Sequence, residues 1–269
     1  MGLWGWEKPS SFNSIKGVAI VAHGLNLRPT RMLPLAQVLR GAGIHPVCVA
    51  LSGHVDGSKS FADVSREAWL DEMLEAYALA RSIADQARCP LYFLGYSLGA
   101  LLGQDLLTER SDVRWDRQVL LAPATHPRTH TRLVRVFQPF GDAFAIPSLS
   151  YAGYAAQKST AMAAYRALFE SEKKLMNTSV DPLRIPTRVY IDPRDEMVST
   201  KKIQKWIEQN KLKEWKLDTL RAQGSLPIQY RHLIIDETTL GKAAWSQLCR
   251  KILFHFKELT KETPADLTA

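Results

Sequence analysis

Leu91-Tyr-Phe-Leu-Gly-Tyr-Ser-Leu-Gly-Ala-Leu-Leu-Gly103 is the segment from which the rest of the chain is best interpreted. It opens with a short apolar run rich in aromatic residues, long enough for a buried strand. Gly95 to Gly99 then have the spacing G-x-S-x-G, and the residues that follow are good helix formers. A strand, a tight turn and a helix with a serine at the apex form the arrangement known as a nucleophile elbow. Ser97 is therefore a candidate nucleophile.

Such an elbow makes specific steric demands. The serine must adopt a sparsely populated backbone conformation, and the flanking chains run so close that side chains at Gly95 and Gly99 would collide. In return, the hydroxyl lies at a helix N-terminus, where backbone N–H groups favour developing negative charge. The alternative interpretation is a buried strand and helix joined by an ordinary Gly-Ser turn, because so short a pattern also arises by chance.

Length and composition indicate a globular protein. The chain has 269 residues, of which 46% are hydrophobic and 23% charged, values that are ordinary for a soluble domain with one large core. No apolar run approaches about 18 residues, so no transmembrane helix is expected. The N-terminal residues lack the basic start and apolar centre of a signal peptide. The three cysteines, Cys48, Cys89 and Cys249, are widely separated and predict a reduced, cytoplasmic protein without a zinc site.

The formal net charge of +8 raises the question of a nucleic-acid partner. The basic residues are scattered, however, and the densest group, between Lys201 and Lys216, alternates with apolar residues as on the solvated face of an amphipathic helix. We therefore expect no nucleic-acid partner. The charge leaves room for a weak attraction to anionic membrane surfaces, which is not in itself evidence of function.

Buried strands alternate with helices along most of the chain. Units of this kind imply βαβ crossovers and a mainly parallel sheet flanked by helices, with ligands bound beyond the carboxyl ends of the strands. Besides the elbow strand and its helix, strands are expected at 16–23, 44–51, 116–122, 185–192 and 215–220. Further helices are expected at about 30–41, 62–87, 199–210 and 238–259.

Residues 124–182 interrupt this alternation. They contain several prolines and aromatic residues, a helical pattern from about 160 to 176, and no obvious strand. Their apolar content favours a lid over a ligand site rather than a surface elaboration. We therefore expect a core formed by residues 1–123 and 183–269, with a helical cap at 124–182 inserted into it.

Four motifs in a fixed order give the sequence a family resemblance. They are His23-Gly24 after the first long strand, Gly95-x-Ser97-x-Gly99, Asp195-x-x-Val198 after a late strand, and His232 before the last helix. Over nearly its whole length the chain resembles the α/β-hydrolase family, in particular its small carboxylesterases and monoacylglycerol-lipase-like members. Ser, then Asp, then His is the chain order of the catalytic triad in that family.

The resemblance implies a role for each residue. Ser97 would be the nucleophile, His232 the base that accepts the serine proton, and Asp195 the acid that orients the imidazole. The backbone N–H groups of Leu25 and Leu98 would form the oxyanion hole. The chain departs from the family at Arg231, where a glycine commonly precedes the histidine.

Some assignments have competitors. Asp192 lies three residues before Asp195 and could instead be a turn residue, and Asp236 is a weaker rival for the acid. Among the seven histidines, His23, His45, His54 and His255 occupy positions typical of structural residues. His126 and His130 have a spacing at which they could ligate a metal, but a lone pair of this kind is usually incidental.

The resemblance thus implies a serine hydrolase that cleaves small, hydrophobic carboxylic esters through an acyl-enzyme intermediate, without a metal or cofactor. A thioesterase, an amidase or a C–C hydrolase would use the same triad. Dehalogenases and epoxide hydrolases of this fold are disfavoured because they carry aspartate where this chain has Ser97. From another class, a non-catalytic binding protein with the same fold is the remaining alternative.

Overall fold

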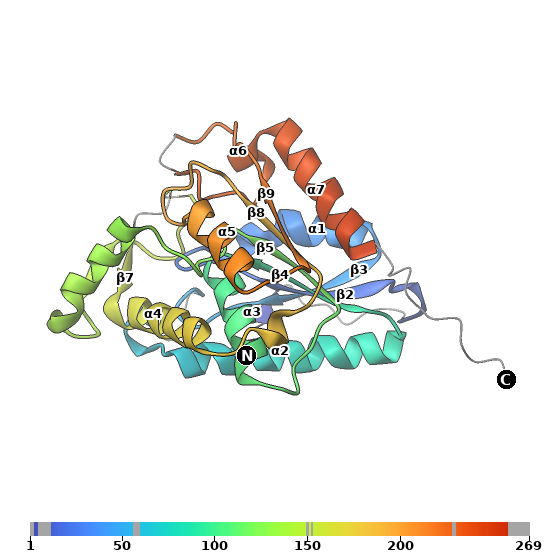
Figure 1. The fold of residues 1–269 in the computed structure, drawn as a ribbon, viewed down its shortest axis with the longest axis horizontal. Coiled ribbons are helices and arrows are strands. Elements are labelled where there is room, and N and C mark those ends of the chain that lie inside the picture. Colours follow the sequence, from blue (N-terminus) through green and yellow to red (C-terminus); the bar gives the residue numbers. More distant parts are fainter. Residues whose placement is uncertain are drawn as a thin grey trace.

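The computed structural model describes residues 3–4, 12–55, 60–148, 151, 153–227 and 230–257. At its centre lies a seven-stranded sheet with the order β1-β3-β2-β4-β5-β8-β9 (Figure 1). The strands are β1 (Leu3–Trp4), β2 (Gly17–Ala22), β3 (Ile44–Val49), β4 (Leu91–Tyr96), β5 (Arg117–Leu121), β8 (Thr187–Ile191) and β9 (Trp215–Thr219). Only β1 is antiparallel to its neighbour, so the mainly parallel sheet predicted from the alternation is confirmed.

Helices cover both faces of the sheet (Figure 1). Side chains of β2 alternate between two hydrophobic cores, with Val18 and Ile20 in one and Ala19 and Val21 in the other. The first core is closed by α2 (Arg66–Ala87), α3 (Leu98–Glu109), α4 (Met162–Asn177) and α5 (Thr200–Gln209). The second is closed by α1 (Leu33–Gly41) and α7 (Lys242–Lys257).

Three expected helices differ in their ends. The helix expected from about residue 30 begins at Leu33, after the 3-10 turn η2 (Pro29–Met32). The helix expected from residue 62 begins at Arg66, because Ser65 caps it by accepting the Ala68 N–H, and a 3-10 turn, η3 (Phe61–Asp63), precedes it. The last helix is divided into α6 (Glu237–Leu240) and α7 at Gly241, whose φ is 80°. The remaining short 3-10 segments are η1 (Phe12–Ser14) and η5 (Asp181–Leu183).

The segment between β5 and β8 adds no strand to the central sheet. It contains the 3-10 helix η4 (Thr129–Phe140), two short antiparallel strands, β6 (Ala145–Pro147) and β7 (Ser159–Ala161), and then α4. The expectation of no strand here was wrong, because three-residue strands are too short to show a twofold pattern in the sequence. α4 packs against α2 and α3 within the first core, whereas η4 buries none of its residues and projects from the molecule (Figure 1).

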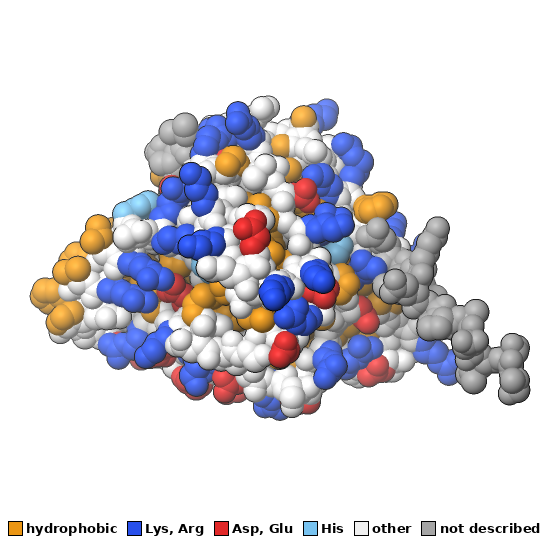
Figure 2. All heavy atoms as spheres, viewed as in Figure 1, with side chains coloured by type: hydrophobic (Ala, Val, Ile, Leu, Met, Phe, Trp, Pro, Cys, Tyr) orange, Lys and Arg blue, Asp and Glu red, His pale blue; other side chains and the backbone are white. Residues whose placement is uncertain are grey.

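The surface agrees with the scattered charge of the sequence. Figure 2 shows Lys and Arg side chains spread over the visible face, and hydrophobic side chains gathered at the projecting end that η4 occupies in Figure 1. No helix within the described residues is both long and apolar enough to span a bilayer.

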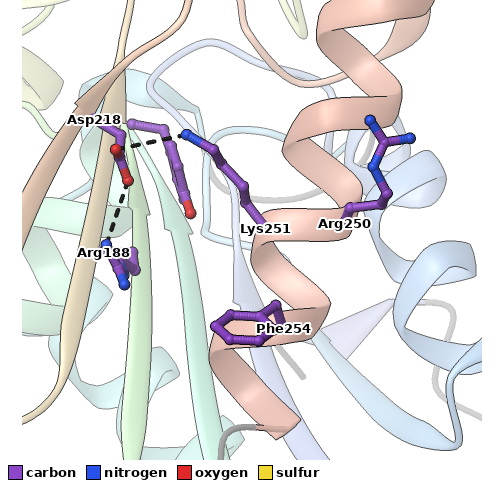
Figure 3. A pocket seen from close by; sticks show the side chains of 6 residues that line it. Arg188, Asp218, Arg250, Lys251 and Phe254 are labelled. Carbon is purple, nitrogen blue, oxygen red and sulfur yellow. Dashed lines mark ion pairs between the residues drawn. The ribbon is translucent and has the colours of Figure 1, made fainter.

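A pocket of about 340 Å³ lies between the β8–β9 edge and α7 (Figure 3). The Asp218 carboxylate forms ion pairs there with Arg188 and Lys251, with N···O distances of 3.6 and 3.5 Å. The pocket is lined by Arg188, Tyr190, Asp218, Arg250, Lys251 and Phe254. Because its acidic group is already paired with two cations and no candidate catalytic residue lines it, we do not assign it a role in the chemistry.

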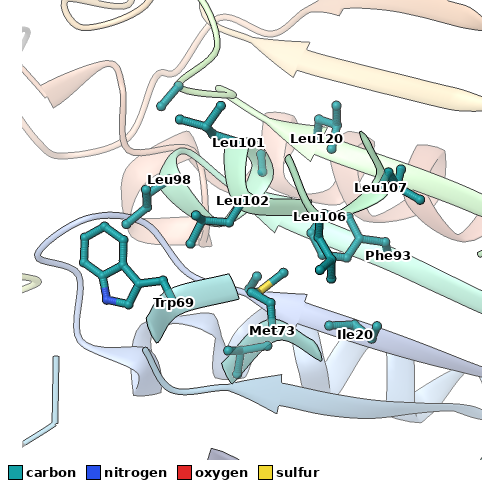
Figure 4. Packing of buried hydrophobic residues seen from close by; sticks show 14 of the residues in the cluster. Ile20, Trp69, Met73, Phe93, Leu98, Leu101, Leu102, Leu106, Leu107 and Leu120 are labelled. Atoms are coloured by element: carbon teal, nitrogen blue, oxygen red, sulfur yellow. The ribbon is translucent and has the colours of Figure 1, made fainter. Parts of the chain in front are cut away.

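The elbow helix α3 rests on the first core. All residues from Leu98 to Leu107 are buried, as expected for a helix that packs on every side. Trp69 and Met73 of α2 and Phe93 of β4 pack against its leucines (Figure 4). Ser97 is therefore carried at the start of a helix that the core holds firmly.

Candidate active site

Ser97 has the backbone geometry of an elbow. It connects β4 to α3 with φ of 49° and ψ of −112°, a conformation that a non-glycine residue rarely adopts. A Cβ atom at Gly95 would lie 2.6 Å from the Ala100 Cα, and one at Gly99 would lie 2.6 Å from backbone atoms of Ala22. Both glycines are required for the close approach of the chains, as the sequence predicted.

Three loops bring Ser97, His232 and Asp195 together. The loop after β8 carries Asp195, and the segment before α6 carries His232. Nε2 of His232 lies 2.8 Å from Oγ of Ser97, and Nδ1 lies 2.8 Å from Oδ2 of Asp195. The three side chains thus form a continuous hydrogen-bonded series, although Ser97 and His232 are 135 residues apart.

The Asp195 carboxylate is fully buried and held from its other side. Its Oδ1 accepts the backbone N–H groups of Met197 and Val198, each at 2.8 Å. These two bonds leave Oδ2 free to accept the imidazole N–H. If Nδ1 is the protonated nitrogen, Nε2 presents its lone pair to the Ser97 hydroxyl.

The two competing aspartates have other partners. Asp192 accepts the N–H groups of the Arg194 guanidinium and the backbone N–H of Ala222 at 2.7 Å. Asp236 caps α6 by accepting the Thr239 N–H and also accepts the Tyr154 hydroxyl at 2.8 Å. Neither carboxylate makes a hydrogen bond to His232.

Glu196 is a second carboxylate beside the imidazole, and the sequence reasoning missed it. Its Oε2 accepts the backbone N–H of His232 at 3.0 Å. Burial alone lowers the pKa of His232, but the charge and hydrogen bond of Asp195, with the charge of Glu196, outweigh it and raise that pKa above its ordinary value. The only sequence signal was the adjacency of Glu196 to the predicted acid.

Arg231, which replaces the usual glycine, anchors the loop that carries His232 through a hydrogen bond. Its guanidinium donates to the Ala222 carbonyl at 2.8 Å, and Arg194 donates to the same carbonyl at 2.9 Å. The loops that carry Asp195 and His232 are thereby tied to one backbone group. The departure from the family pattern leaves His232 within hydrogen-bond distance of Ser97.

The predicted oxyanion-hole residues lie on either side of Ser97. Leu98 is the first residue of α3, and the Gly24–Leu25 turn passes so close that a Cβ atom at Gly24 would lie 3.1 Å from the Ser97 Cβ. Within the described residues, neither the Leu25 nor the Leu98 N–H donates to a backbone carbonyl of a turn, loop or cap. The N–H groups of both residues stay candidates for the oxyanion hole.

Two buried histidines support the Gly24–Leu25 turn. Nε2 of His23 accepts the Leu51 N–H at 3.1 Å, and Nε2 of His54 accepts the Asn26 N–H at 2.9 Å. Because each Nε2 is an acceptor, each ring is neutral with its proton on Nδ1. Burial lowers the pKa of His23 to about 4, which agrees with the structural role predicted for both.

His126 and His130 lie in different surroundings. His126 packs on Trp206, and burial lowers its pKa to about 4, whereas His130 lies exposed on η4. The described part of the chain contains no group of three or more His, Cys, Asp or Glu arranged to hold a metal ion.

Known structures share this architecture. A soluble variant of monoglyceride lipase from Saccharomyces cerevisiae is 11% identical, with a TM-score of 0.75 over 91% of this chain and 87% of that one. The metagenome-derived lipolytic enzymes LipS and LipT give 16% identity and a TM-score of 0.70 over 91% of this chain and 95% of the matched chain. Monoacylglycerol lipase from Paleococcus ferrophilus is 14% identical, with a TM-score of 0.63 over 91% of this chain and 97% of that one. At these identities the likeness establishes the fold alone.

Sequence comparison establishes the family. No curated protein sequence matches the chain. The family model described as serine aminopeptidase, S33, matches residues 13–210, which include the elbow and the Asp195 loop. The resemblance inferred from the four motifs is thus confirmed, and the chain belongs to the serine aminopeptidase S33 family of α/β hydrolases.

Proposed function

We propose that this protein is a serine hydrolase that cleaves carboxylic esters through an acyl-enzyme intermediate. The observation that carries the proposal is the hydrogen-bonded series Ser97–His232–Asp195, with 2.8 Å at each step, built on an elbow. A hydroxyl, a base and an orienting carboxylate in this geometry are the requirements of nucleophilic acyl transfer.

In the first half-reaction, Oγ of Ser97 attacks the ester carbonyl carbon while Nε2 of His232 takes the hydroxyl proton. The Leu25 and Leu98 N–H groups would stabilise the negative charge that develops on the carbonyl oxygen. The carbon–oxygen bond to the alcohol then breaks, and the alcohol leaves with the proton from His232. Water, deprotonated by the same imidazole, attacks the acyl-serine, and Ser97 recovers its proton as the acid departs.

Asp195 acts through the imidazole. Its hydrogen bond to Nδ1 selects the tautomer in which Nε2 is the acceptor, and its charge stabilises the imidazolium that forms during each half-reaction. Glu196 fixes the backbone of the same histidine and adds negative charge nearby. We therefore expect Glu196 to be a positioning residue rather than a second acid.

Two observations bear on the substrate class. The inserted segment carries exposed aromatic side chains, and several proteins of similar structure are described as lipases or lipolytic enzymes. Both favour a hydrophobic acyl or alcohol group. The predicted cap at 124–182 stays a prediction, and the packing of α4 in the core indicates that the projecting part of the inserted segment ends before that helix.

The free cysteine thiols favour a reducing compartment such as the cytoplasm.

Amide hydrolysis is the second candidate, because the family is described as serine aminopeptidases and would use the same triad. Matched substrates separate the two. We expect p-nitrophenyl esters to be turned over with kcat/KM increasing from acetyl to longer acyl chains, and p-nitroanilides of the same acids to be turned over far more slowly. Faster turnover of the anilides would replace the ester assignment with an amidase.

The Ser97→Ala variant tests the chemistry itself. Loss of the triad serine lowers kcat by about 10⁶-fold in a serine protease, so we expect no ester turnover above background. Ser82→Ala, on the exposed surface of α2, is the matched control and should retain full turnover. Undiminished turnover by Ser97→Ala would refute the proposal.

A further inference from the structure

The projecting helix η4 exposes an apolar surface that the fold leaves uncovered. Leu133 is 65% exposed, Val136 67% and Phe140 67%, and the rings of Phe137 and Phe144 pack beside Phe140 with centroids 6.3 and 5.2 Å away. We call these five residues the η4 tip. Large apolar side chains gathered in this way are uncommon on a soluble monomer and mark a surface that contacts something else.

The surroundings of the η4 tip are positively charged. Residues 123–144 contain Arg128, Arg132 and Arg135 and a single carboxylate, that of Asp142, which Arg166 of α4 neutralises in an ion pair. Arg132 and Arg135 share a single buried carboxylate, that of Glu172, so the group keeps a net positive charge. Figure 2 shows the hydrophobic end with Lys and Arg side chains on the adjoining surface.

The η4 tip lies at the same edge of the sheet as the candidate active site. η4 follows the carboxyl end of β5, between the carboxyl ends of β4 and β8 that lead to Ser97 and Asp195. At the base of η4, Arg128 donates to the Asp195 carbonyl at 2.6 Å, and Pro127 pairs with Val198. A body that covered the η4 tip would therefore lie at the site edge of the molecule.

These observations favour one occupant. A second copy placed symmetrically against the η4 tip would oppose one group of arginines with another, which is unfavourable. A bilayer that contains anionic lipids offers an apolar interior for the leucine, valine and phenylalanine side chains and negative headgroups for the arginines. We propose that the η4 tip is a docking surface for anionic lipid bilayers.

Docking in this way presents the site edge of the sheet to the membrane. Together with the proposed function, on which this step rests, it assigns the ester substrate to molecules that partition into bilayers. The binding itself needs no catalysis and is tested separately from it.

Vesicle flotation with the Ser97→Ala variant measures binding without consuming lipid. We expect the protein to float with vesicles of phosphatidylcholine and phosphatidylglycerol, and to float less with vesicles of phosphatidylcholine alone. With the anionic vesicles, about 0.5 M salt should also reduce flotation, because it screens the arginines. Phe140→Glu in the same background should weaken partitioning by about tenfold or more, because it replaces an exposed ring that would enter the bilayer with a charge.

Phe254→Glu is the matched control. Phe254 is 63% exposed, but it lies on α7 beside the pocket of Figure 3, away from η4. It should bind vesicles like the unsubstituted chain, and melting temperatures should show that both variants fold. Equal loss in the two variants, or no flotation of the parent, would overturn the docking surface.

A dimer that Phe140→Glu dissociates, measured by analytical ultracentrifugation, would instead assign the η4 tip to a second copy and also overturn the proposal. Turnover of a water-soluble p-nitrophenyl ester by the wild-type chain reports on the proposed function alone. Turnover without vesicle binding would refute only the docking surface, and vesicle binding without turnover would refute only the hydrolase.

Discussion

The candidate active site and the η4 tip lie at the same edge of the sheet but follow opposite physical rules. Around Ser97 the fold buries polar groups and gives them partners: Asp195 is fully buried and accepts three hydrogen bonds. At the η4 tip the fold exposes apolar groups and leaves η4 without a single buried residue. Burial of polar groups in the first region and exposure of apolar groups in the second both lower the stability of the fold relative to an ordinary surface.

The difference indicates where each region finds its partner. The site is completed from within the chain, because three distant loops supply all the groups that orient the imidazole. The η4 tip is incomplete in the isolated chain and requires an outside surface to cover it. Substitutions in the first region should therefore act on chemistry and folding, whereas those in the second should act on neither.

Among the residues that orient the imidazole, the acid should have the largest effect. Asp195→Asn should reduce kcat for a p-nitrophenyl ester by roughly 10⁴-fold, because an amide no longer enforces the reactive imidazole tautomer. Asp192→Asn is a closely matched control, since that carboxylate is equally buried but bonds to Arg194 and Ala222. If Asp192→Asn lost more activity than Asp195→Asn at equal folded fraction, the acid would have to be reassigned.

A smaller effect on stability separates the two regions directly. Leu101 is fully buried in α3 beneath the elbow, whereas Leu133 is 65% exposed on η4. Leu101→Ala should lower the free energy of unfolding by about 2–5 kcal/mol through the cavity it creates. Leu133→Ala should change it by no more than about 0.5 kcal/mol. Urea unfolding measures both, and comparable losses would show that the η4 tip is packed in solution.

The smallest effect concerns the pH dependence of turnover. Only neutral His232 can act as the base, so activity should be lost as the pH falls through its pKa, which is raised above the ordinary histidine value. Glu196→Gln removes a negative charge that stabilises the imidazolium and should move the midpoint of kcat/KM to lower pH. Asp142→Asn, beside the η4 tip and paired with Arg166, should leave the midpoint unchanged. A shift to higher pH in Glu196→Gln would contradict this assignment of the charges.

The sequence predicts well what depends on local pattern and family order. Glycines at 95 and 99, a buried strand before Ser97 and a helix after it are all readable, because steric demands at a tight turn restrict the residues that fit. The order of Ser97, Asp195 and His232 also follows from the resemblance to the family. The geometry between them needed the fold, since three loops far apart in the sequence meet there.

What the sequence did not predict depends on long-range contacts. The hydrogen bond between Glu196 and the His232 backbone and the sharing of the Ala222 carbonyl by Arg194 and Arg231 leave no periodic trace. The sequence also does not reveal β6 and β7, because strands of three residues are too short to show an alternating pattern. The aromatic residues of η4 suggested a cover for the site, and only their exposure shows that the helix faces outward.

The most direct test of the account is the reaction of the folded chain with a fluorophosphonate, followed by peptide mass spectrometry. We expect one phosphonyl group, on Ser97, and none in a folded His232→Ala variant, because the hydroxyl reacts only when the imidazole takes its proton. Absence of labelling in folded wild-type protein, or labelling of a different residue, would contradict it.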